Sequence, residues 1–171
     1  MNHVDLYKKW VNNPEVRRFA RSMIPITKEE IKKHIEKQAN KIKDSFSFEI
    51  YHKKEAKPIG DCGFNKIDWV DRRGIIGLGI GEPKYWNQGL ASEAVRLLLQ
   101  YGFEELDLYK ITADIFSPNI GSWKAAEKVG MRREAELSRY TYIEGEYVDN
   151  LIYCIFKNEW LNQKNKNKIE V

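Results

Sequence analysis

The chain has 171 residues, of which 42% are hydrophobic and 32% charged, and its formal net charge is +4. This length and composition predict a single globular domain over residues 1–171, with charges mixed along the chain rather than gathered into the basic stripe of a nucleic-acid-binding protein. No apolar run approaches the roughly 20 residues needed to cross a bilayer, and the first residues do not begin a secretory signal, so we expect a cytoplasmic protein with no membrane partner.

The N-terminal part is predicted to be helical. Apolar spacing predicts a helix over residues 5–11, and a second short segment over 15–20 follows Pro14. Residues 27–30, Thr-Lys-Glu-Glu, are a capping box, which predicts a third helix that ends near Lys43. One side of this helix is formed by Ile31, Ile35, Gln38 and Ile42.

Three antiparallel strands are predicted next. Alternation over residues 46–52 predicts the first strand, and a turn over 53–57 joins it to the second, over 58–68. A turn over 70–73 leads to the third strand, in which every second residue from Gly77 to Gly81 is glycine. One face of this strand therefore has no side chains, and we expect a ligand to lie there against bare backbone. The other face keeps three apolar residues for the core: Ile76, Leu78 and Ile80.

The chain then enters a helix through residues 87–91, Asn-Gln-Gly-Leu-Ala. Small residues let successive backbone N–H groups converge at the start of this helix, and such a terminus attracts phosphate. The alternative is an ordinary strand-to-helix turn with glycines chosen for tight packing. A dinucleotide fingerprint is excluded because Glu82 replaces its third glycine, and a Walker motif because Leu90 and Ala91 follow Gly89. An apolar stripe should anchor the helix on a sheet: Ala91, Ala94, Val95, Leu98 and Tyr101.

The C-terminal part is predicted to return to the sheet. The helix ends near Leu106, a strand follows over 110–116, and Asn119 caps a helix that ends at Val129 before a left-handed Gly130. A closing hairpin is predicted from 140–143 and 147–156 around Glu-Gly-Glu, and residues 160–171 should be a frayed tail.

Two motifs carry a resemblance to a known family. Residues 85–94 resemble the acyl-CoA-binding motif of the GNAT family of N-acetyltransferases, in the branch that resembles ribosomal-protein N-terminal acetyltransferases. The family pattern Arg/Gln-x-x-Gly-x-Gly/Ala is matched at Gly89 and Ala91, with Trp86 in the first position, as is usual in that branch. Residues 119–131 resemble the family's Asn-x-x-Ser…Glu-Lys-x-Gly-Phe segment. Two motifs in the right order are more specific than one, and the resemblance spans roughly residues 5–160.

The resemblance implies an α+β fold with a mixed, mostly antiparallel central sheet flanked by helices. Family members usually have a strand before the first helix, whereas this chain begins inside the helix. We therefore expect the first strand to be absent, replaced or supplied by another copy. A missing edge strand exposes the backbone groups of the next strand, which leaves a homodimer open.

The resemblance also implies the donor and its binding site. Acetyl-CoA would supply the acetyl group, and an amine would attack the thioester directly. The backbone at residues 80–82 would pair with the pantetheine arm and offer an N–H to the developing oxyanion, and main-chain N–H groups at 87–92 would hold the pyrophosphate. The expected cofactor-binding residues are Ile80, Gly81, Glu82, Asn87, Gln88, Gly89, Leu90, Ala91, Ser92, Asn119 and Ser122.

Two catalytic residues are expected on the same basis. Ser122 is the hydroxyl best placed by the motif to interact with the departing thiolate, since Ala126 stands where many relatives have a tyrosine acid. Glu82 is the candidate general base, with a proton path through water as its competitor. The three histidines have no metal-ligand spacing, so no metal is expected. Cys62 and Cys154 suit buried thiols in a reducing compartment better than a covalent route.

The expected function is acetyl-CoA-dependent acetylation of a primary amine, either a protein N-terminus or a small amine. A polyamine or an aminoglycoside is the alternative acceptor. Two alternatives belong to other functional classes. One is a non-catalytic acyl-CoA-binding sensor, and the other is a general α/β nucleotide-binding module. The acceptor itself cannot be read from the sequence because variable loops and the first helices shape its pocket.

Overall fold

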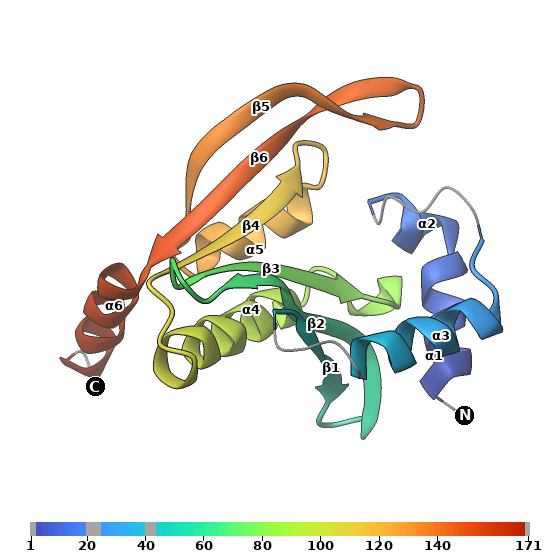
Figure 1. The fold of residues 1–171 in the computed structure, drawn as a ribbon, viewed down its shortest axis with the longest axis horizontal. Helices are drawn as coiled ribbons and strands as arrows, with labels where there is room; N and C mark the ends of the chain where they lie inside the picture. Colours follow the sequence, from blue (N-terminus) through green and yellow to red (C-terminus); the bar gives the residue numbers. More distant parts are fainter. Residues whose placement is uncertain (1–2, 20–24, 40–43, 170–171) are drawn as a thin grey trace.

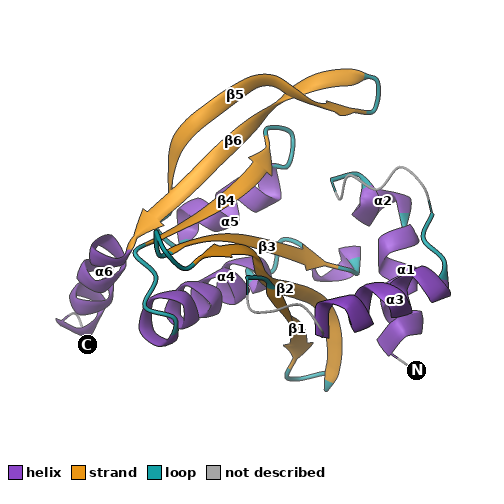
Figure 2. Cartoon of the chain, viewed as in Figure 1, coloured by secondary structure: helices purple, strands orange, loops and turns teal. Residues whose placement is uncertain are grey.

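The computed structural model describes residues 3–19, 25–39 and 44–169, which form helices around one open sheet (Figure 1; Figure 2). The helices are α1 (His3–Asn12), α2 (Pro14–Arg17), α3 (Lys28–Ala39), α4 (Leu90–Gln100), α5 (Ile120–Lys128) and α6 (Lys157–Ile169). The strands are β1 (Phe46–His52), β2 (Lys57–Asp68), β3 (Arg73–Ile80), β4 (Lys110–Phe116), β5 (Arg132–Ile143) and β6 (Glu146–Phe156). A 3-10 turn, η1 (Pro83–Tyr85), precedes α4, and a π-helical turn, η2 (Tyr101–Glu105), follows it.

The sheet has six strands in the order β1-β2-β3-β4-β6-β5. All neighbours pair antiparallel except β3 and β4, which are parallel. This mixed, mostly antiparallel sheet confirms the expected fold class. Both hairpins of the β1–β3 meander, the strand β4 and the turn of the closing hairpin lie where the sequence predicts them, but β5 begins at Arg132, well before the predicted start at residue 140.

The sheet opens between its two parallel strands. β3 pairs with β4 only from Arg73 opposite Lys110 to Ile76 opposite Ala113. Beyond these pairs β3 continues to Ile80 and β4 continues to the end of its own span, and the two no longer pair (Figure 1). The part of β3 that diverges is therefore the part that carries the alternating glycines.

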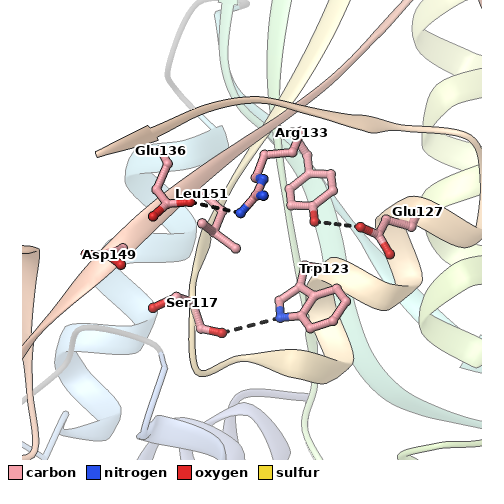
Figure 3. Close-up of a pocket in the computed structure, with 8 residues that line it drawn as sticks. Ser117, Trp123, Glu127, Arg133, Glu136, Asp149 and Leu151 are labelled. Atoms are coloured by element: carbon pink, nitrogen blue, oxygen red, sulfur yellow. Dashed lines mark hydrogen bonds and ion pairs between the residues drawn. The ribbon is translucent and has the colours of Figure 1, made fainter. Parts of the chain in front are cut away.

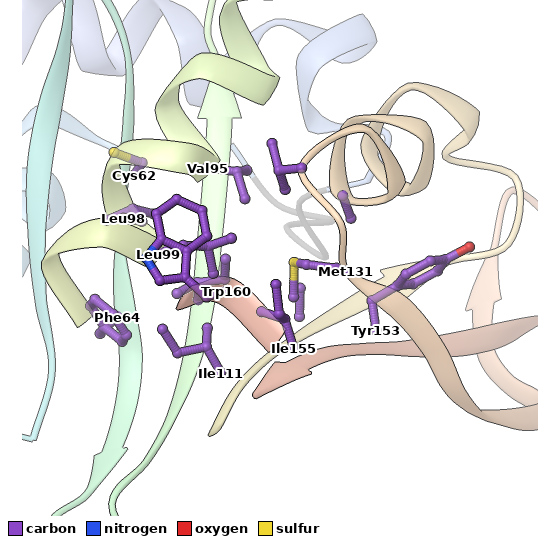
Figure 4. Packing of buried hydrophobic residues seen from close by; sticks show 14 of the residues in the cluster. Cys62, Phe64, Val95, Leu98, Leu99, Ile111, Met131, Tyr153, Ile155 and Trp160 are labelled. Carbon is purple, nitrogen blue, oxygen red and sulfur yellow. The ribbon is translucent and has the colours of Figure 1, made fainter. Parts of the chain in front are cut away.

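The main core lies on the face of the sheet that α4 and α5 cover. Ile111 of β4 and Ile155 of β6 belong there to one buried cluster with Val95, Leu98 and Leu99 of α4 (Figure 4). The apolar stripe predicted for α4 is confirmed at its centre, because Ala94, Val95 and Leu98 are buried. This helix is thereby fixed to the sheet next to the opening.

The N-terminal region contains helices, and no strand precedes β1 within residues 3–19 and 25–39. The capping box of α3 is confirmed, since Thr27 N–H donates to Glu30 Oε2 (2.8 Å) and Glu30 N–H donates to Thr27 Oγ1 (3.2 Å). The predicted continuation of this helix to Lys43 lies outside the described residues, as does Ile42 on its predicted apolar side.

The C-terminal tail is where the prediction is wrong. Residues 157–169 form helix α6, although we expected a frayed tail from residue 160. The helix is fixed at its start, where Trp160 is 8% exposed and lies 6.2 Å from the ring of Phe103. Glu159 also accepts a hydrogen bond from the backbone N–H of Phe156 (2.8 Å). The tail was predicted to be frayed because it is rich in Asn and Lys, and the contribution of Trp160 was overlooked.

None of the helices within the described residues is long and apolar enough to span a membrane.

Candidate functional site

The opening between β3 and β4 exposes one edge of β3. The N–H of Gly81 donates to the carbonyl of Ile59 on the β2 side (2.8 Å), and in an antiparallel ladder successive residues point their backbone groups to opposite sides. Leu78 and Ile80 therefore direct their N–H and C=O groups toward the opening. These groups are suited to a ligand that pairs like an added strand.

The structure changes which of the residues 80–82 can donate a hydrogen bond to the thioester. Because the N–H of Gly81 is already bonded to β2, it is not the donor for an oxyanion, and the N–H of Ile80 is the better placed group. The carbonyl of Ile80 accepts from Trp86 Nε1 (2.9 Å). The tryptophan at the first motif position thus fastens the corner to the end of β3.

The corner before α4 has the geometry of an anion site. Gly89 has φ +80° and precedes the helix without any side-chain cap, and Asn87 also has a positive φ of 59°. The first intrahelical bond runs from Glu93 N–H to Gly89 C=O (3.1 Å). The N–H groups of residues 90–92 therefore have no acceptor within the helix, and the positive end of the helix dipole adds to their attraction for phosphate.

A lysine that the sequence reasoning missed faces this corner. A Cβ placed on Gly89 would lie 3.8 Å from Lys128 Nζ, so the ammonium group of α5 reaches the start of α4. No ion pair of Lys128 is found within the described part of the chain. Lys128 belongs to the Glu-Lys pair of the second motif. Its contact with Gly89 could not be predicted from the sequence because the two residues lie on different helical segments.

The corner is also held to the β1–β2 turn. Tyr85 is 4% exposed and donates its hydroxyl hydrogen bond to Glu55 Oε2 (2.7 Å), and this bond, with Lys57 and Lys84 nearby, lowers the pKa of Glu55 to about 2. Gln88 Nε2 donates to the carbonyl of Lys84 (2.6 Å). The side chain of Gln88 therefore fixes the loop, and only its main chain is free to serve as a ligand.

The second motif lies at the start of α5, directly after β4. Asn119 Oδ1 accepts from Ser122 N–H (3.4 Å), which confirms the helix-capping role. Ser122 is partly buried in the first turn, and its hydroxyl makes no hydrogen bond within the described residues. The fold thus places Ser122 on the β4 side of the opening, across from the end of β3.

Glu82 lies at the other side, directly after β3. It is 18% exposed, and its carboxylate oxygens lie 3.9 Å from Lys9 Nζ and 4.0 Å from Lys84 Nζ. These two ion pairs are enough to explain why a carboxylate lies at this position. The structure therefore adds no specific support to the base role expected for it.

The glycine face of β3 is not bare, which corrects the expectation of a ligand lying along it. A Cβ on Gly81 would overlap the indole ring of Trp10, and a Cβ on Gly77 would lie 2.6 Å from Asn65 Nδ2. Of these three glycines, only Gly79 could accept a Cβ without overlap, since the added atom would lie in ordinary contact with Asp61 Oδ1 at 3.8 Å, the one described atom within 4 Å. Trp10 of helix α1 thus occupies the space at Gly81, and Asn65 of β2 occupies the space at Gly77.

Asp61 is the second residue that the sequence reasoning missed. It lies on β2 opposite Gly79, is partly buried, and burial raises its pKa to about 6. Burial and the charge of Asp61 raise the pKa of Tyr7 to about 12. The antiparallel register of a carboxylate opposite a glycine is the sequence signal that could have identified it.

A separate pocket of about 460 Å³ lies between α5 and the β5–β6 hairpin (Figure 3). It is lined by Ser117, Trp123, Glu127, Arg133, Glu136, Asp149, Leu151 and Tyr153. Its charged groups already have partners: Arg133 pairs with Glu136 (2.8 Å), Glu127 accepts from the Tyr153 hydroxyl (2.8 Å), and Asp149 Oδ1 accepts from a backbone N–H (2.8 Å). None of the expected site residues lines it.

Comparison with known proteins gives one family. Residues 2–132 match the family model described as an acetyltransferase (GNAT) domain. An uncharacterized N-acetyltransferase, p20, from Bacillus licheniformis is 35% identical over 74% of this chain and 67% of its own length. The spermidine N(1)-acetyltransferase of Escherichia coli K12 is 29% identical over 70% of this chain and 68% of its own length.

A solved structure shows the same fold. The spermidine N-acetyltransferase from Vibrio cholerae in complex with CoA and spermine superposes with a TM-score of 0.84, over 92% of both chains, at 20% identity. Two further curated relatives from Bacillus subtilis are matched over only 46% and 55% of their own length.

Proposed function

The chain belongs to the GNAT family of N-acetyltransferases, and we propose that it transfers the acetyl group of acetyl-CoA to a primary amine, either a peptide N-terminus or a small molecule. The observation that carries the proposal is the opening of the sheet. It directs the backbone groups of Leu78 and the N–H of Ile80 toward a gap that ends at the uncapped start of α4. A long thioester with a phosphorylated end fits both features.

We assign the following roles to the residues around the opening. The N–H groups of residues 90–92 and the Lys128 ammonium hold the pyrophosphate. The backbone of Leu78 and Ile80 pairs with the pantetheine arm, and the N–H of Ile80 stabilises the negative charge that develops on the carbonyl oxygen. Bound acetyl-CoA supplies a carbonyl that an amine can attack directly.

Two classes of acceptor compete. A polyamine is the second candidate because one relative over 70% of the chain is a spermidine N(1)-acetyltransferase. The test is release of free CoA from acetyl-CoA with a panel of peptides, polyamines and aminoglycosides, followed by mass spectrometry of the acceptor. If the protein binds acetyl-CoA but releases no free CoA with any amine of the panel, the result would favour a sensor and contradict the proposed transfer.

Ser122 is proposed to interact with the departing thiolate. The hydroxyl has no other partner within the described residues and lies on the β4 side of the opening. We expect Ser122→Ala to lower kcat about 10- to 100-fold at saturating acetyl-CoA, with little change in the affinity for CoA. Unchanged kcat would remove Ser122 from the mechanism. Ser45, a partly buried serine before β1, provides a matched alanine control.

We also propose that the protein is cytoplasmic and forms a homodimer. Both cysteines are free and buried, which suits a reducing compartment. β1 is an edge strand with one unpaired side in the described part of the sheet, and such edges favour pairing between copies. Light scattering should give twice the chain mass of 20.2 kDa, and a monomer at tens of micromolar would contradict the dimer.

A further inference from the structure

The acceptor side of the opening contains one small gap. Along the glycine face of β3, Trp10 fills the space at Gly81 and Asn65 fills the space at Gly77, whereas the space at Gly79 has only Asp61 Oδ1 near it among the described atoms. Gly79 lies between Leu78 and Ile80, the two residues whose backbone faces the opening. The gap is therefore adjacent to the place where the thioester carbonyl is proposed to lie.

Asp61 has the properties of a carboxylate without a built-in counterion. Its side chain makes no hydrogen bond or ion pair within the described residues. The group that faces it from α1 is Tyr7, a phenol that stays protonated because its pKa is raised to about 12. Across the ladder on β1 its partner is Glu49, another acid. A carboxylate in these surroundings is stabilised by a cation that arrives from outside the protein.

We propose that the gap at Gly79 is the subsite for the acceptor's ammonium group, and that Asp61 binds this group and removes its proton. The proposal rests on the acetyl-transfer function given above and names its base. The substrate class is a primary ammonium, because Trp10 and Asn65 occupy the space at Gly81 and Gly77, and among these glycines only Gly79 leaves room for a small added group beside Asp61. The terminal amine of a polyamine or the N-terminus of a peptide that begins with a small residue has this shape.

The proton balance of the reaction is simple. The ammonium gives one proton to the Asp61 carboxylate, and the free amine nitrogen attacks the thioester carbon. As the C–N bond forms and the C–S bond breaks, the nitrogen loses its second proton and the sulfur leaves as a thiol after taking up one proton. The products are the acetamide, free CoA and one proton released to solvent from Asp61.

Asp61 is a better candidate than Glu82 for this step. The carboxylate of Glu82 lies between the ammonium groups of Lys9 and Lys84, which already balance its charge. Asp61 pairs with no cation in the part of the chain that the structure describes, and burial raises its pKa to about 6, which suits a base that works near neutral pH.

The test compares Asp61→Asn with the wild-type protein and with Asp71→Asn, which removes an exposed carboxylate in the β2–β3 turn. For the amine that the wild type acetylates best, we expect Asp61→Asn to lower kcat/KM at least 100-fold while the Kd for acetyl-CoA changes less than threefold. Asp71→Asn should behave as wild type. The heat of spermidine or peptide binding in the presence of CoA should be lost in Asp61→Asn alone.

The pH profile distinguishes a base from a merely structural residue. The carboxylate is active only when deprotonated, so wild-type kcat/KM should rise through pH 6 and level off above pH 7. In Asp61→Asn only amine that is already neutral in solution can react, so kcat/KM should rise about tenfold per pH unit from pH 6 to 9. Glu82→Gln should keep the wild-type shape.

A steric variant tests the gap independently of the charge. Gly79→Ala adds a methyl group in ordinary contact, 3.8 Å from Asp61 Oδ1, and the glycine has no positive φ, so the variant should fold. We expect its KM for the amine to rise at least tenfold with unchanged Kd for acetyl-CoA.

The outcomes separate this inference from the proposed function. Acetyl transfer by the wild type with less than a threefold loss in Asp61→Asn would overturn the subsite and leave the acetyltransferase function intact. Tight acetyl-CoA binding without transfer to any amine and without amine binding would overturn both. A flat pH profile shared by wild type and Asp61→Asn would overturn the base role.

Discussion

Replacement of Gly89 by valine should raise the Kd for acetyl-CoA at least 100-fold, measured by calorimetry with CoA and acetyl-CoA. Gly89 has φ +80°, a region that costs a β-branched residue about 1–2 kcal/mol. The new side chain also stands where the N–H groups of residues 90–92 converge and where Lys128 Nζ approaches. A 100-fold loss corresponds to about 2.7 kcal/mol of binding free energy, which the blocked anion contacts must supply, because the backbone strain destabilises the free and the bound protein alike.

The matched control is Gly145→Val. Gly145 has φ +93° in the β5–β6 turn with nothing within 4 Å, so valine there causes the same kind of backbone strain far from the corner. It should reduce stability without changing the affinity for acetyl-CoA. Lys128→Gln should weaken binding by a smaller, salt-dependent factor of about 3–10. Equal affinities of the Gly89 and Gly145 variants would contradict a phosphate site at the start of α4.

Replacement of Trp10 by alanine should lower the free energy of unfolding by about 3–5 kcal/mol, measured by urea denaturation. Trp10 is 5% exposed and lies on the backbone of Gly81, where it holds α1 against the glycine face of β3. Its loss should also raise the KM for the amine, because α1 carries Tyr7 above Asp61. The control is Trp69→Ala, in a side chain that is 48% exposed in the β2–β3 turn and should matter by less than about 1 kcal/mol.

A double-mutant cycle identifies the contact. Gly81→Ala should destabilise the protein by about 1–3 kcal/mol because its methyl group would overlap the indole ring. In a Trp10→Ala background the same methyl group enters the space that the indole vacates, so its cost should largely disappear. Additive effects of the two changes would mean that the ring does not rest on Gly81.

The sequence predicted the features that depend on local pattern. The strand alternation of β1 to β4, the capping box at Thr27 and the glycine turn before α4 are each encoded within a few neighbouring residues, and each lies where the sequence predicts it, whereas the first part of β5 was not predicted. The two family motifs occur in the expected order along the chain. The positions of Gly89 before α4 and of Asn119 before α5 could therefore be predicted from short motifs.

The features that the sequence did not reveal depend on contacts between distant segments. Trp10 and Gly81 are 71 residues apart, so the glycine was interpreted as room for a ligand when it is room for an indole ring. The nearness of Lys128 to Gly89 needs the packing of α5 on α4. That Asp61 has no counterion among the described residues depends on how segments distant in the sequence pack around it, and a local pattern does not show this.

The opening in the sheet has a mechanical consequence. In the described structure, the half of the sheet formed by β1, β2 and β3 pairs with the half formed by β4, β6 and β5 only at Arg73–Ile76. These strand pairs all lie at one end of the opening. Such a joint is stiff at the paired end and compliant at the far end, where Ile80 and Phe116 terminate their strands. A long ligand bound between β3 and β4 would therefore connect the two halves of the sheet at the end where their strands do not pair.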